Sequence, residues 1–73
     1  MDVDFHEGDL VNATEQVLAD GTWGTVEVPA TAFGRVREVD RKLDGSPKKV
    51  RVSFRLEHEE IPAWVDPWQL IHA

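Results

Sequence analysis

The chain has no cysteine among its 73 residues. It can therefore form neither a disulfide bond nor a thiolate metal site. The absence of cysteine fits a reducing compartment, and we expect a cytoplasmic protein. A domain of this size usually gains only about 3–5 kcal/mol from its hydrophobic core. With disulfides excluded, association with a partner is one of the few remaining ways to add stability.

Long apolar runs are also absent. No stretch approaches the roughly 20 apolar residues that a membrane-spanning helix needs. The first residues, MDVDFHEGD, are acidic and lack the basic and apolar segments of a signal peptide. Apolar residues make up 41% of the chain, which is enough for a folded domain. We expect a single domain over residues 1–73 with no membrane association.

Lysine and arginine are missing from most of the chain, which has a net charge of −6. Residues 33–55, FGRVREVDRKLDGSPKKVRVSFR, hold all eight bases and three acids, a balance of +5. The remaining eleven acids have no base among them, a balance of −11. Such a division indicates either the solvated face of a hairpin or a surface selected for electrostatic contact.

Residues 48–56, KKVRVSFRL, alternate apolar and polar side chains, which is the pattern of a half-buried strand. Residues 34–39 are also rich in β-forming residues, and LDGSP between the two segments favours a turn. We therefore expect an antiparallel hairpin with Asp44-Gly45 as its two-residue turn. This register places Val39 opposite Val50.

The same register predicts a bulge. Continued without a break, it would place Arg37 and Arg35 on the core face. Each buried arginine without a partner costs several kcal/mol. A one-residue bulge near Arg37-Glu38 removes the conflict, because Val36 then lies opposite Val52 and Arg35 turns outwards.

The N-terminal half is less regular. Residues 9–12 are expected as a short strand, and NATEQVLADG fits either a capped helical turn or one arm of a hairpin. Asp20-Gly21 favours the hairpin, with residues 22–28 as the returning strand. In this pairing Leu18 and Trp23 share one face, and the opposite face holds Val17, Ala19, Val26 and Val28.

The C-terminal part adds two short strands. Residues 63–65 and 70–72 are expected as strands, and DPWQ between them as a 3₁₀ turn opened by Pro67. Pro29 separates the first hairpin from the second. Five or six short strands with closely spaced turns predict an all-β fold, a small barrel.

This order of segments resembles an SH3-like barrel. The matching segments are GDLV, the long loop through Trp23, GRVREV with KKVRVSF, and VDPWQLI. The pattern G-x-V-x-x-V followed by V-x-V-x-F is similar to KOW domains, to the small barrel protein of photosystem I and to the C-terminal barrel of the nitrile hydratase β chain. The resemblance implies a single barrel of five or six antiparallel strands with a 3₁₀ turn before the last strand. Such barrels bind peptides, bind nucleic acids or brace an enzyme as non-catalytic subunits, and the lack of tyrosine argues against a proline-rich ligand here.

Residues that could carry chemistry are few. The three histidines are scattered, and EHEE at residues 57–60 lacks the spacing of a metal site and indicates a solvated acidic turn. The chain has no glycine-rich phosphate loop and no nucleophile beside a His–acid pair. We expect neither catalysis nor a metal or other cofactor.

The first functional hypothesis is a non-catalytic protein-interaction module or accessory subunit that docks on a larger partner or self-associates. Trp23 and Leu18 are the candidate anchors, because an exposed tryptophan beside a leucine is typical of interfaces. The alternative for Trp23 is burial by its own loop. Trp68 follows Pro67 in the turn where an SH3-like barrel places part of its ligand groove, and it is the third candidate, with packing in the core as the alternative. Trp64 is expected to pack in the core or at a hinge.

The alternative hypothesis is KOW-like nucleic-acid binding through the basic hairpin, residues 33–55. Arg35, Arg51 and Arg55 share its solvent face and would contact phosphates, with Lys48 and Lys49 near its tip. The acidity of the whole chain opposes this reading, since nucleic-acid-binding proteins usually have a basic balance.

Overall fold

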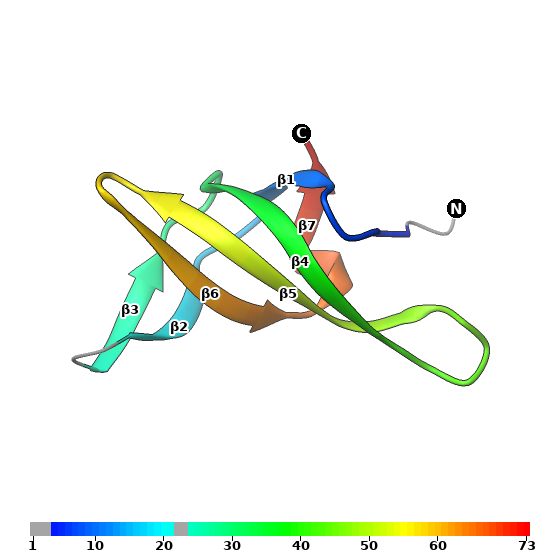
Figure 1. Ribbon diagram of the computed structural model, residues 1–73. Coiled ribbons are helices and arrows are strands. Elements are labelled where there is room, and N and C mark those ends of the chain that lie inside the picture. Colours follow the sequence, from blue (N-terminus) through cyan, green and yellow to red (C-terminus); the bar gives the residue numbers. More distant parts are fainter. Residues whose placement is uncertain (1–3, 22–23) are drawn as a thin grey trace.

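The computed structural model describes residues 4–21 and 24–73, which form β-strands and one short 3₁₀ helix (Figure 1). In chain order the elements are β1 (Leu10–Ala13), β2 (Val17–Gly21), β3 (Gly24–Val28), β4 (Phe33–Arg41), β5 (Pro47–Leu56), β6 (Glu59–Val65), η1 (Pro67–Gln69) and β7 (Leu70–His72). The predicted all-β class is confirmed. In this part of the chain no helix is long and apolar enough to cross a membrane.

Five strands form one antiparallel sheet in the order β6-β5-β4-β1-β7, and β2 and β3 form a separate two-stranded sheet. Strand β2 packs against β6. Figure 1 shows the β2–β3 hairpin at one end of the molecule and the tip of the β4–β5 hairpin at the other. Among the described residues, no strand pairing joins the two sheets into a closed barrel.

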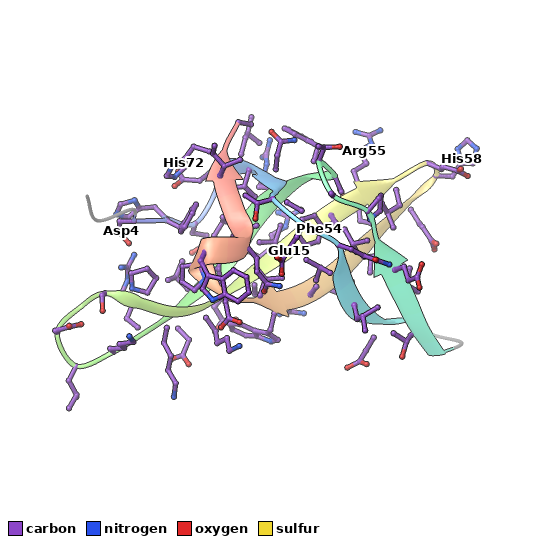
Figure 2. The ribbon with its side chains drawn as sticks, turned by 180° about the vertical axis from the view of Figure 1, so that it is seen from behind. Asp4, Glu15, Phe54, Arg55, His58 and His72 are labelled. Atoms are coloured by element: carbon purple, nitrogen blue, oxygen red, sulfur yellow. The ribbon has the colours of Figure 1, made fainter. Side chains whose placement is uncertain are left out.

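The core is built from apolar side chains that alternate along the strands. Strand β5 is central to it, since Val50, Val52 and Phe54 are each 0% exposed. Figure 2 shows Phe54 in the middle of the molecule and its neighbour Arg55 at the outside. The inner face of the β2–β3 hairpin adds Val17, Ala19 and Val28 to the same cluster. The predicted alternation of β5 is confirmed.

The predicted bulge in the β4–β5 hairpin is present. The register runs through the pairs Val36↔Val52, Glu38↔Arg51 and Val39↔Val50. Arg37 is therefore the extra residue in β4. Val36 is buried whereas Arg35 and Arg37 are exposed, so the bulge keeps the charged side chains out of the core.

The predicted turn at the tip of this hairpin is wrong by one residue. The Gly45 N–H donates to the Lys42 carbonyl at 3.0 Å, which places Leu43-Asp44 at the centre of the turn. Gly45 has φ +87°, the left-handed conformation that follows such a turn in a three-residue hairpin loop. A second irregularity in the β4–β5 register compensates for the change, so the pairs nearer the core stay as predicted.

The two faces predicted for the β2–β3 hairpin are confirmed, but the turn predicted for it is wrong. Val17 lies opposite Val28 and Ala19 opposite Val26, as expected for a shared inner face. The pairing continues through Asp20, opposite Thr25, to Gly21, opposite Gly24, so Asp20 and Gly21 are paired strand residues and not the predicted turn. The helical alternative for this segment is excluded.

The N-terminal segment is fastened to the tip of β4 by Arg41. Its guanidinium donates to the Asp4 carboxylate (Nη1–Oδ1 2.8 Å) and to the Phe5 carbonyl oxygen (Nη2–O 2.7 Å). The hydrogen bond from Arg41 lowers the pKa of the Asp4 carboxyl below its ordinary value. Phe5 is fully buried and its ring lies 4.6 Å from that of His72. Phe5 is a core residue that the sequence patterns did not predict.

Gly34 in β4 is a glycine that the core requires for space. A Cβ atom at this position would lie 2.6 Å from Cγ1 of Val52 and 3.1 Å from Cδ1 of Phe54. Both neighbours are fully buried and cannot move aside. We expect Gly34→Ala to lower the free energy of unfolding in urea by about 1–3 kcal/mol.

A double-mutant cycle checks this cause. Combining Gly34→Ala with Val52→Ala removes the closest contact, so the two losses should sum to more than the loss of the double variant. Strictly additive losses would show that the contact with Val52 is not the reason.

Candidate functional site

The main candidate site is an exposed apolar surface where β2 lies beside β6. Leu18 on β2 is 67% exposed and Trp64 on β6 is 49% exposed. Both line one hollow of about 290 Å³, between the two strands and β5. Five of the residues that line this hollow are named the docking patch: Leu18, Asp20, Arg51, Pro62 and Trp64.

Strand alternation positions the docking patch. Leu18 lies between two buried residues of β2, and Trp64 between two buried residues of β6, so both side chains point away from the core. Trp64 stands directly opposite Arg51 in the β5–β6 ladder. The prediction that Trp64 packs in the core is wrong, because Ala63 and Val65 occupy the inward positions of that strand.

The structure brings together only part of the predicted partner site. Leu18 is exposed as predicted, and among the described residues Trp64 is the tryptophan that shares its hollow. Trp23 lies outside the described residues. Trp68 is 66% exposed on η1, is not among the residues that line this hollow, and its carbonyl oxygen accepts a hydrogen bond from Thr14 Oγ1 at 3.3 Å. A signal for Trp64 was present in EEIPAWV, where Ile61, Ala63 and Val65 alternate with the residues that face outwards.

Arg35, Arg51 and Arg55 lie on the exposed outer face of the β4–β5 hairpin, as predicted. Within the described residues, the side chains of Arg35, Arg51 and Arg55 form no ion pair or hydrogen bond, and we name them the free arginines. The other predicted contacts differ: Lys49 Nζ pairs with Asp66 Oδ1 at 2.7 Å, whereas Lys48 is exposed.

A second hollow, of about 200 Å³, lies on this outer face and was not predicted. Its charged and aromatic lining residues are Phe33, Arg35, Arg37, Arg55 and Glu60. Phe33 is 43% exposed. Three guanidinium groups against one carboxylate suit an anion. Glu60 already provides one negative charge in this hollow. Its Oε2 atom lies 3.8 Å from Arg37 Nη2 and accepts a hydrogen bond from Ser53 Oγ at 3.3 Å.

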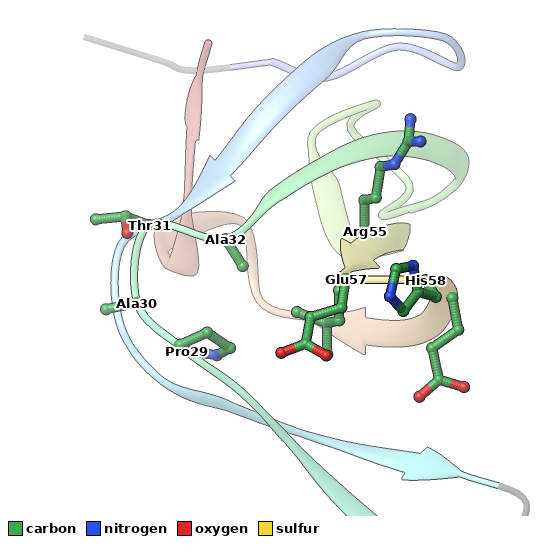
Figure 3. Close-up of a pocket in the computed structure, with 9 residues that line it drawn as sticks. Pro29, Ala30, Thr31, Ala32, Arg55, Glu57 and His58 are labelled. Atoms are coloured by element: carbon green, nitrogen blue, oxygen red, sulfur yellow. The ribbon is translucent and has the colours of Figure 1, made fainter.

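A third hollow, of about 720 Å³, lies between the β3–β4 connection and the β5–β6 turn (Figure 3). One wall is residues 29–32, and the other is Arg55 with residues 56–59. Figure 3 shows Arg55, Glu57 and His58 pointing in different directions, so these polar groups do not converge on one point. The EHEE segment is exposed, as expected for an acidic turn.

The histidines do not build a metal site. His72 Nε2 and His6 Nδ1 lie 3.3 Å and 4.0 Å from the same Asp9 oxygen, Oδ2, and His58 is on the β5–β6 turn. In the part of the chain that the structure describes, no group of three or more histidine, aspartate and glutamate side chains is arranged to hold a metal ion.

Comparison of the chain with protein-family models, with curated proteins and with solved structures gave no match. Its function is therefore inferred from the chemistry and placement of its own residues.

Proposed function

We propose that this protein is a non-catalytic protein-interaction module or accessory subunit with the architecture of an SH3-like barrel. The architecture is supported by the strand order β6-β5-β4-β1-β7, by the β2–β3 hairpin that packs on β6, and by the 3₁₀ turn before the last strand. Its binding surface is the docking patch.

The observation that carries this function is that Leu18 and Trp64 share one exposed hollow beside Arg51. Tryptophan and arginine are the residues that most often dominate the binding energy of protein interfaces. Interface cores combine such aromatic groups with apolar neighbours, which Leu18 and Pro62 provide here.

The docking patch is also held ready for a partner. Its residues lie on paired strands, and the buried residues on either side of Leu18 and Trp64 fix their direction. Little conformational freedom is then lost on binding, which favours affinity. The test is a photo-crosslinking amino acid at position 18, whose adduct with the partner should be lost on Trp64→Ala.

Nucleic-acid binding is a second candidate function, and the free arginines favour it. Arg35 lies opposite Ser53, between Arg51 and Arg55 on the neighbouring strand. Diagonal neighbours on a sheet are about 7–8 Å apart, so the three guanidinium groups are spread along a path that an extended strand of phosphates can follow. The exposed Phe33 lines one hollow with Arg35 and Arg55 and offers a surface on which a base would stack.

This second function predicts salt-dependent binding of a short single-stranded oligonucleotide. Each phosphate contact contributes about 0.7 to the slope of log affinity against log salt. We expect Arg55→Gln to lower that slope by about this amount in a fluorescence anisotropy titration. Lys49→Gln is the matched control, because Lys49 is paired with Asp66. Absence of binding at low salt would rule this function out.

A further inference from the structure

We propose that the partner of the docking patch is a second copy of this chain, related to the first by a two-fold axis. The proposal rests on the proposed function and names the occupant of the same site. It follows from how charge is distributed across the patch.

The docking patch has a base at one margin and an acid at the other. Across the surface the strands follow the order β5, β6, β2, because β5 pairs with β6 and β6 packs against β2. Arg51 is on β5, Trp64 is on β6, and Leu18 and Asp20 are on β2. Trp64 and Pro62 on β6 therefore lie between one positive and one negative group, with Leu18 beside Asp20 on β2.

This order is complementary to itself. A two-fold axis through the apolar centre places β5 of each copy against β2 of the other. Arg51 of one copy then meets Asp20 of the second copy, and the same contact is repeated on the other side of the axis. The two Trp64 side chains and their Leu18 neighbours are brought together at the centre and leave water.

The charges that this contact needs are available in the single chain. Among the described residues, neither Arg51 nor Asp20 forms an ion pair. The β2 margin is acidic beyond Asp20, since Glu27 lies opposite Leu18 and the described part of the β2–β3 hairpin has no base. A partner for this margin needs a positive charge next to an apolar group. A second copy of the chain supplies both, because its Arg51 lies opposite its Trp64 in the β5–β6 ladder.

The size of the chain also favours a second copy. A domain of 73 residues buries a small core, and symmetric association is a common way for such domains to gain stability. Two-fold dimers are by far the commonest homo-oligomers.

Sedimentation equilibrium from about 10 µM to about 1 mM tests the proposal, since a small interface is populated in this range. We expect a monomer–dimer equilibrium with no larger species. Arg51→Asp and Asp20→Arg should each raise the dimer dissociation constant at least about tenfold, because each creates two like-charge contacts. Both side chains are exposed, so both variants should keep the circular dichroism spectrum of the original protein.

The decisive arms are the double variant and the mixture. Arg51→Asp combined with Asp20→Arg in one chain should restore the homodimer. An equimolar mixture of the two single variants should form a heterodimer, because one copy then carries two acids and the other two bases. A monomer at all concentrations, growth beyond dimers, or failure of both arms to restore association would overturn the proposal. If the chain stays monomeric but position 18 still crosslinks to another protein, the second copy is excluded and the proposed function stands.

Discussion

Phe54→Ala is expected to leave the domain largely unfolded at room temperature. Removing a fully buried phenylalanine costs about 3–5 kcal/mol, from the lost transfer of the ring and from the cavity that remains. Phe54 is 0% exposed and lies on β5 within the core cluster, so the site cannot be filled by solvent without opening the core. The expected loss is comparable with the whole stability of a domain of this size.

Phe33→Ala is the matched control, because it makes the same chemical change on the outer face of β4. Phe33 is 43% exposed, and we expect its loss to cost less than about 1 kcal/mol. Urea unfolding followed by circular dichroism measures both. Equal losses at the two positions would contradict the assignment of inner and outer faces.

Much of the fold could be predicted because burying charge is expensive. The bulge at Arg37 was predicted for that reason alone, and the structure has it. The two hairpin turns were less predictable, because alternatives that differ by one or two residues differ little in free energy. At the tip of β4–β5, Gly45 adopts the left-handed conformation after Leu43-Asp44 instead of serving as the second residue of a two-residue turn.

The candidate site was only partly predictable for a different reason. Leu18 could be assigned to an outer face from the alternation of β2 alone. Its contact with the hollow of Trp64 depends on the packing of β2 on β6, which joins segments far apart in the sequence. The burial of Phe5 also depends on a distant residue, since Arg41 holds the N-terminal segment.

Arg51 belongs to both proposed surfaces, because it lines the docking patch and is one of the free arginines. Its substitution therefore weakens either function. Trp64→Ala and Arg55→Gln separate the two, since Trp64 belongs to the docking patch and Arg55 to the free arginines alone.

Trp64→Ala is expected to have the largest effect on partner binding. Truncation of an interface tryptophan typically costs about 2 kcal/mol or more, which corresponds to about a 30-fold loss of affinity. The fold should be retained, since Trp64 is half exposed and the core positions of β6 are unchanged.

Photo-crosslinking from position 18 measures this effect in the cells that produce the protein. Leu43 is the matched control position, because it is another leucine, fully exposed at the tip of the β4–β5 hairpin and outside the docking patch. If the docking patch is the binding surface, position 18 should give a discrete adduct and position 43 little or none. Trp64→Ala should then remove most of the adduct from position 18. Equal adducts from both positions, or an adduct that Trp64→Ala leaves unchanged, would contradict it.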